Sequence, residues 1–144
     1  MSRPPRPAPR ETTTASEEET IRLARDLAKS FNGREVVLLT GELGAGKTVF
    51  VKGLAAGLGM KDTRSVCSPS YTLLNIYQAK FAIYHFDLYR LSRMSEVRDL
   101  GLEDFLENGV VVVEWAEKLP PDIQGIRVTI KVGKAGRRTI RVER

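Results

Sequence analysis

The segment Gly41–Thr48 matches the phosphate-loop pattern Gly-x-x-x-x-Gly-Lys-[Ser/Thr] and constrains this chain more than any other feature. It follows the apolar run Val36–Leu39 and precedes a segment with helical spacing. Backbone N–H groups of such a loop bind phosphate oxygens, and the N-terminus of the following helix adds positive potential. The sequence therefore predicts an α/β fold that binds a nucleoside triphosphate, with a P-loop NTPase-like central mixed β-sheet flanked by helices.

Residues of the loop and of the helix start are expected to bind the nucleotide. Lys47 would reach the β- and γ-phosphates, and the Thr48 hydroxyl would bind Mg²⁺. The chain has no Asn-Lys-x-Asp motif for guanine, which favours ATP over GTP. The predicted nucleotide-binding residues of this segment are Glu42, Leu43, Gly44, Ala45, Gly46, Lys47, Thr48 and Val49.

Hydrophobic periodicity predicts the remaining elements. A capping box of Ser16 and Glu19 begins a helix that ends near Asn32, and a second helix should run from about Gly46 to Leu58. Two shorter helical pieces, 95–100 and 102–107, are separated by Gly101. Strands are expected at 36–40, 72–77, 81–86, 110–113, 126–132 and 139–143, with the last two forming a C-terminal β-hairpin.

The length of 144 residues fits one domain, which we place at residues 16–144. Residues 1–15 begin with several prolines and arginines and are expected to form a disordered tail. Cys67 is the single cysteine, so no intramolecular disulfide can form. No apolar run approaches the roughly 18 residues of a membrane span. A cytoplasmic protein is the simplest interpretation.

Two carboxylates follow buried strands. Asp87 ends the strand 81–86, and Glu114 follows the run Val110–Val113. Open α/β sheets bind ligands at the carboxyl ends of their strands, and Mg²⁺ usually takes one or two protein carboxylates. We therefore predict Thr48, Asp87 and Glu114 as metal ligands, in an arrangement resembling a Walker B site, and Lys47, Asp87 and Glu114 as catalytic residues. The alternative for each acid is a solvated strand end.

Three other residues have two interpretations each. His85 could orient a water or a phosphate, or could be a hydrogen-bonded structural residue. Arg90 could act as an arginine finger or form a surface ion pair. Trp115, next to Glu114, could stack at the edge of the site or fill the core.

The net charge of +5 is concentrated at the ends of the chain. Residues 125–144 carry seven basic side chains and one acidic side chain, so this segment could meet RNA or an acidic protein surface, or could be a solvated hairpin. The basic side chains are Arg127, Lys131, Lys134, Arg137, Arg138, Arg141 and Arg144.

Taken together, the phosphate loop, the Ser68-Pro69-Ser70-Tyr71 segment, the His-Phe-Asp-Leu-Tyr-Arg-Leu run at 85–91 and the Glu114-Trp115 pair resemble the TsaE family. The likeness covers about residues 16–132. It implies a small ATPase of tRNA threonylcarbamoyladenosine biosynthesis that hydrolyses ATP slowly and serves the TsaB–TsaD complex. Contact with tRNA would be indirect, through that complex.

The resemblance also implies roles for individual residues. Ser68–Ser70 and the run containing Asp87 would behave as switch regions around the γ-phosphate, and Glu114 would help to hold the metal. Ser68 and Ser70 are therefore added to the predicted nucleotide-binding residues. Ser70 stands where the family usually has threonine, which keeps the hydroxyl. The segments 62–70 and 87–94 are the candidates for a two-state element.

Two other classes of function stay open at this stage. A small-molecule kinase would use the same phosphate loop but needs an acceptor pocket. A nucleic-acid-binding module would rely on the basic C-terminal segment and would bind RNA directly, with a steep dependence on salt.

Overall fold

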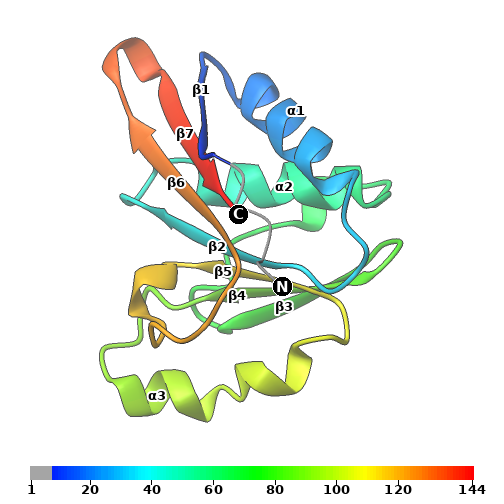
Figure 1. Ribbon diagram of the computed structural model, residues 1–144, viewed down its shortest axis with the longest axis vertical. Helices are drawn as coiled ribbons and strands as arrows, with labels where there is room; N and C mark the ends of the chain where they lie inside the picture. Colours follow the sequence, from blue (N-terminus) through cyan, green and yellow to red (C-terminus); the bar gives the residue numbers. More distant parts are fainter. Residues whose placement is uncertain (1–7) are drawn as a thin grey trace, which may run out of the picture.

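The computed structural model describes residues 8–144 and shows an α/β fold with a seven-stranded mixed sheet (Figure 1). The strand order is β1-β7-β6-β2-β5-β4-β3. Helices α1 and α2 lie on one side of the sheet and α3 on the other. The elements are β1 (Arg10–Thr14), α1 (Glu17–Ala28), β2 (Val36–Gly41), α2 (Lys47–Gly57), β3 (Leu74–Gln78), β4 (Ala82–Asp87), α3 (Met94–Asp99), β5 (Val110–Glu114), β6 (Ile126–Val132) and β7 (Arg138–Glu143).

The central strands are apolar on both faces because both faces are covered. In β2, Val37 and Leu39 belong to the hydrophobic core under α1 and α2, whereas Leu38 belongs to the core on the α3 side. All four valines of Val110–Val113 in β5 are completely buried and alternate between these two cores. This explains why the two strands appear in the sequence as continuous apolar runs rather than as alternating patterns.

Helices α1 and α2 pack closely because α2 carries two glycines, Gly53 and Gly57, at their contact. A Cβ atom added at Gly53 would lie 2.5 Å from the backbone oxygen of Ile21 and 2.6 Å from Cβ of Ala24. Gly53 is therefore required by packing against α1, although glycine is a poor helix former.

Gly53→Ala is expected to lower the free energy of unfolding by up to about 2 kcal/mol, because overpacking costs about 1–3 kcal/mol while the better helix propensity of alanine returns about 1 kcal/mol. Urea unfolding followed by circular dichroism measures this difference. A more stable variant, as helix propensity alone requires, would contradict the packing argument.

The strands that end at the phosphate loop and at the two acids are neighbours and parallel. β5 pairs with both β2 and β4 in parallel, and the register places Glu114 opposite Leu39 on one side and opposite Asp87 on the other. The carboxyl ends of three strands therefore lie at one edge of the sheet, which brings both acids to the side where the phosphate loop begins.

The sequence-based prediction of most elements is confirmed. Ser16 is the N-cap of α1 and its hydroxyl accepts a hydrogen bond from the Glu19 backbone N–H at 3.2 Å. The pair β3 and β4 is an antiparallel hairpin, and so is the C-terminal pair β6 and β7. The C-terminal hairpin joins the central sheet because β6 pairs in parallel with β2.

The prediction of a disordered tail at residues 1–15 is wrong for 10–14, and its first seven residues lie outside the described part of the chain. Residues Arg10–Thr14 form β1, which pairs antiparallel with β7 from Arg10 opposite Val142 to Thr14 opposite Arg138. Without β1, the outer edge of β7 would expose unpaired backbone groups. The β-branched residues Thr12–Thr14 suit a strand, and the tail prediction gave too little weight to them. Among the helices of residues 8–144, none has the length and apolar composition needed to cross a membrane.

Candidate functional site

A cavity of about 430 Å³ opens where the carboxyl ends of β2, β4 and β5 meet the start of α2. Its walls come from the loop before α2, from the segment before β3, from the ends of β4 and β5, and from the start of α1. The residues around it are Ser16, Glu17, Thr20, Leu43, Gly44, Ala45, Gly46, Lys47, Thr48, Val49, Ser68, Ser70, Asp87, Tyr89, Glu114, Trp115, Gly136 and Arg138.

The loop between β2 and α2 takes a conformation that depends on glycine. Gly44 has φ 78° and Gly46, the N-cap of α2, has φ 106°. Both values lie in the left-handed region, which side chains with a Cβ rarely adopt. The loop turns back on itself at these residues, and the N-terminus of α2 then faces the cavity with its free backbone N–H groups.

Lys47, the first residue of α2, is a buried cation at the bottom of this loop. Its side chain Nζ donates hydrogen bonds to the backbone oxygens of Gly41 at 2.6 Å and Glu42 at 2.9 Å, and it lies 4.1 Å from the centre of the Trp115 ring. Burial lowers the pKa of Lys47, while the carboxylate of Glu114 opposes this effect. An ammonium group has three donors, so one donor beyond these two hydrogen bonds can meet an incoming anion.

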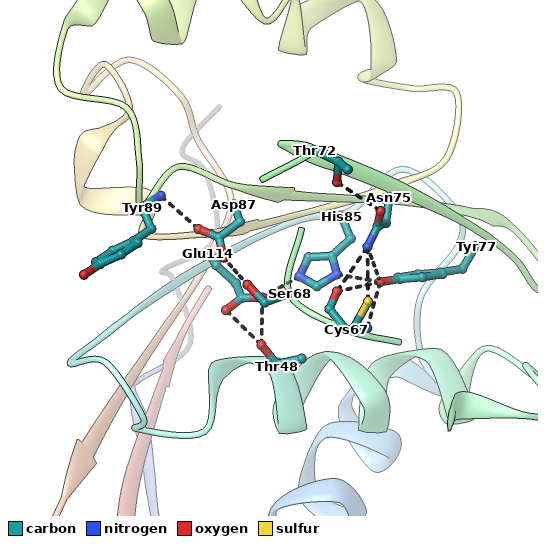
Figure 2. A network of polar contacts seen from close by, with 10 residues as sticks. All are labelled: Thr48, Cys67, Ser68, Thr72, Asn75, Tyr77, His85, Asp87, Tyr89 and Glu114. Carbon is teal, nitrogen blue, oxygen red and sulfur yellow. Dashed lines mark hydrogen bonds and ion pairs between the residues drawn. The ribbon is translucent and has the colours of Figure 1, made fainter. Parts of the chain in front are cut away.

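Glu114, at the end of β5, is hydrogen-bonded on two sides (Figure 2). The Thr48 hydroxyl donates to its two carboxylate oxygens at 3.1 and 3.2 Å, and Nε2 of His85 lies 2.5 Å from Oε2. Glu114 is 3% exposed, so these partners compensate for the water that the carboxylate loses on burial. The hydroxyl and the carboxylate consequently sit side by side at the cavity.

Asp87, at the end of β4, connects two segments to the sheet. One carboxylate oxygen accepts a hydrogen bond from the Ser68 hydroxyl, and the other accepts from the Tyr89 backbone N–H at 2.8 Å. Its side chain therefore holds the segment before β3 and the segment after β4 at the same place.

The oxygens of Thr48, Asp87 and Glu114 are the hard donors that Mg²⁺ prefers. Within residues 8–144, no group of three or more His, Cys, Asp or Glu side chains is arranged to hold a metal ion. Mg²⁺ usually combines one or two carboxylates with waters and substrate phosphates, and the donor set here fits that mode of binding.

Trp115 follows Glu114 in a strained conformation with φ 61°. A bulky residue in the left-handed region costs on the order of 1–2 kcal/mol, and here the turn brings the ring to the cavity. The ring lies over Lys47 and beside the Tyr89 ring, with 5.0 Å between the two ring centres. Trp115 thus lies at the edge of the site and also packs against the core on the α3 side, so both interpretations of this residue hold in part.

His85 and Arg90 do not line the cavity. His85 is completely buried behind Glu114, whereas Arg90 is exposed and lies over the Tyr71 ring at 4.3 Å. The arginine-finger interpretation of Arg90 has no support in this arrangement.

The structure brings nearly all the sequence-predicted site residues to one cavity. Residues 43–49, Ser68, Ser70, Asp87 and Glu114 line it. Glu42 does not, and contributes a backbone oxygen to Lys47 instead.

Residues at the starts of α1 and β7 also line the cavity, and no motif in the sequence predicts this. Ser16, Glu17 and Thr20 lie at the start of α1, where the sequence gives no sign of a binding role. Arg138 was assigned to the basic cluster, but its Nε donates to the Ala45 backbone oxygen at 2.9 Å and thus supports the phosphate loop. For this side chain, the interpretation as part of a solvated hairpin surface is therefore wrong.

Comparison with known proteins shows which family this chain resembles in sequence and in fold. The family model for "Threonylcarbamoyl adenosine biosynthesis protein TsaE" matches residues 14–140. The tRNA threonylcarbamoyladenosine biosynthesis protein TsaE of Aquifex aeolicus is 39% identical over 136 residues, which are 94% of this chain and 96% of that protein. Its counterpart in Bacillus subtilis is 40% identical over 125 residues, covering 85% and 77% of the two chains.

Two further matches extend this result. The TsaE protein of Rickettsia conorii is 44% identical over 106 residues, which are 73% of this chain and 60% of that longer protein. The crystal structure of YdiB from Bacillus subtilis superposes with a TM-score of 0.74 at 33% identity, covering 94% of this chain and 85% of YdiB. By sequence and by fold, the chain belongs to the TsaE family of threonylcarbamoyl adenosine biosynthesis proteins.

Proposed function

We propose that this protein is a P-loop ATPase that binds ATP with Mg²⁺ and, on its own, hydrolyses ATP slowly. Together with the TsaB–TsaD complex, it would take part in the threonylcarbamoyladenosine modification of tRNA next to the anticodon. Its place of action would be the cytoplasm. Membership of the TsaE family supports the pathway, and the geometry of the cavity supports the ATPase.

The ATPase proposal rests mainly on one observation. The hydroxyl of Thr48, at the N-terminus of α2, lies within hydrogen-bond distance of the Glu114 carboxylate at the end of β5. A P-loop serine or threonine and a carboxylate at the end of a neighbouring strand are the protein groups that hold Mg²⁺ in P-loop NTPases. Bound there, Mg²⁺ would neutralise charge on the β- and γ-phosphate oxygens.

The protein's own residues would act mainly by positioning and by charge. The backbone N–H groups of Gly44–Thr48 would bind phosphate oxygens, and Lys47 would stabilise the negative charge that the γ-phosphoryl group carries during transfer. Water would attack the γ-phosphorus in line with the leaving oxygen. Asp87 would hold Ser68 and Tyr89 around the γ-phosphate, so both segments could respond to hydrolysis.

The partner would complete the site. Tyr89 is exposed at the mouth of the cavity and rests against Trp115, which lies over Lys47. A protein that contacts Tyr89 would therefore affect the residues that hold the phosphates, which gives a physical route for stimulation by TsaB–TsaD. Direct contact with tRNA is not needed in this scheme.

Mg²⁺-dependent ATP hydrolysis by the purified protein, with and without purified TsaB–TsaD, tests the proposal. We expect slow turnover alone and faster turnover with the complex. Robust turnover that is indifferent to TsaB–TsaD would remove the partner from the proposal. ATP loss that requires an added metabolite would indicate the kinase alternative, and direct RNA binding that weakens steeply with salt would indicate the nucleic-acid alternative.

A further inference from the structure

A chain of hydrogen bonds leads from the cavity into the interior of the protein (Figure 2). Thr48 donates to Glu114, and Oε2 of Glu114 lies 2.5 Å from Nε2 of His85. On the other side of the imidazole ring, Nδ1 lies 2.9 Å from the Tyr77 hydroxyl. Every polar atom along this chain therefore has a partner, and Glu114 has a fixed orientation.

The Tyr77 hydroxyl also contacts the segment that carries Ser68. It lies 3.1 Å from the backbone oxygen of Cys67 and 3.3 Å from the Cys67 backbone nitrogen. The Asn75 side chain donates to the same backbone oxygen at 3.2 Å. Burial raises the pKa of Tyr77, which keeps the phenol protonated and able to donate. The position of residues 67 and 68 is thus tied to the same chain that orients Glu114.

His85 lies between Glu114 and Tyr77 and so connects Glu114 to the segment of residues 67 and 68, although it does not line the cavity. It is 0% exposed, and the strand pair β3 and β4 places it opposite Asn75. A buried imidazole needs a hydrogen-bond partner at each ring nitrogen whatever its role, so the role of His85 depends on which partners these are. One is the Glu114 carboxylate at the cavity, and the other is the Tyr77 hydroxyl, which contacts the segment that carries Ser68. Groups that orient a metal-binding carboxylate in this way typically contribute 10–100-fold to metal affinity or activity.

We propose that His85 and Tyr77 are positioning residues that hold the Glu114 carboxylate toward Thr48 and the cation of a bound Mg²⁺–nucleotide, and that fix Cys67 and Ser68 relative to it. The inference rests on the proposed function, because it assigns these two residues to the metal side of the nucleotide site. It predicts that they affect nucleotide binding only when Mg²⁺ is present.

The test uses three variants of the full chain. Tyr77→Phe removes one oxygen atom and leaves the ring. His85→Ala removes both contacts of the imidazole, and His85→Gln restores a donor that can reach Glu114. Tyr84→Phe is the matched control, since Tyr84 lies on the neighbouring strand, packs against Phe105 with ring centres 4.9 Å apart, and its hydroxyl has no hydrogen-bond partner within residues 8–144.

The measurement is the affinity for a non-hydrolysable ATP analogue in Mg²⁺ and in EDTA. Binding is detected by the change in fluorescence of Trp115, the single tryptophan. In the wild type, Mg²⁺ should tighten binding. In His85→Ala and Tyr77→Phe, the Mg²⁺ concentration at half-saturation should rise about tenfold, while the affinity in EDTA should stay within twofold of the wild type. His85→Gln should recover most of the Mg²⁺ effect, and Tyr84→Phe should match the wild type.

Two results would overturn the inference, and a third would overturn the proposed function instead. Equal losses of affinity in Mg²⁺ and in EDTA would indicate a merely structural role, and so would an unchanged Mg²⁺ dependence in both His85→Ala and Tyr77→Phe. A wild type that binds no ATP analogue, or binds it without any effect of Mg²⁺, would remove the proposed function itself. If His85→Ala fails to fold, Tyr77→Phe decides alone, because the loss of one oxygen leaves the packing in place.

Discussion

Replacing Lys47 with alanine is expected to reduce ATP binding and hydrolysis at least about 100-fold, which is the largest effect of any single substitution in this chain. Lys47 is 5% exposed, and its ammonium group is held inside the phosphate loop by the backbone oxygens of Gly41 and Glu42. It is already fixed before the nucleotide arrives, so it contributes charge without having to be ordered. Without it, the phosphates would enter a site next to two buried carboxylates, and no other buried lysine or arginine in residues 8–144 would offset their charge.

Lys52→Ala is the matched control for this experiment. Lys52 is on the same helix, is half-buried and does not line the cavity. The two variants should unfold at similar temperatures, whereas only Lys47→Ala should lose binding of a fluorescent ATP analogue. Near-normal turnover in Lys47→Ala would show that the loop is not the phosphate site.

Glu114→Gln is expected to lower Mg²⁺-dependent turnover about 100-fold while the affinity for ATP in EDTA stays within a few-fold of the wild type. Glutamine keeps the shape of the side chain and can still accept a hydrogen bond from Thr48, but it lacks the negative charge that attracts the cation. The glutamine also no longer repels the phosphates, so the nucleotide should still bind in the absence of the metal. Turnover measured across a Mg²⁺ titration separates the two effects.

Asp87→Ala should act differently within the same assay. Asp87 accepts hydrogen bonds from Ser68 and from the Tyr89 backbone, so removing its carboxylate should loosen two segments around the γ-phosphate as well as remove charge. We expect a fall in turnover of similar size with a smaller change in the Mg²⁺ concentration at half-saturation. Glu103→Gln, an exposed substitution away from the cavity, is the control for lost charge. Normal turnover in both site variants would contradict the assignment of these two acids.

Local patterns identified most of the elements because each pattern reflects a short-range rule. The capping residue Ser16 and the following helical spacing located α1, and the run Val110–Val113 located a strand buried on both faces. The strand β1 was missed because its stability comes from pairing with β7, more than 120 residues away in the sequence. The β-branched residues Thr12–Thr14 are a weaker local signal than a capping box or a run of four valines.

In the candidate site, too, local patterns identified some residues, whereas the roles of others depend on contacts between distant segments. The sequence indicated Lys47, Thr48, Asp87 and Glu114, because a phosphate loop and acids at strand ends are recognisable by type and position. It gave two interpretations of His85, and the choice between them depends on which side chains its ring nitrogens meet. Those partners are eight and 29 residues away in the sequence.

The sequence by itself determined that this chain has a phosphate loop between a strand and a helix, and that two acids stand at strand ends, since these are properties of consecutive residues. Only the tertiary structure decided which strands are neighbours, and hence that Glu114 meets Thr48 while Asp87 meets Ser68. It also brought α1 and Arg138 to the cavity. Such contacts depend on strand order and register, which arise from burial and hydrogen bonding across the whole sheet rather than from any local pattern.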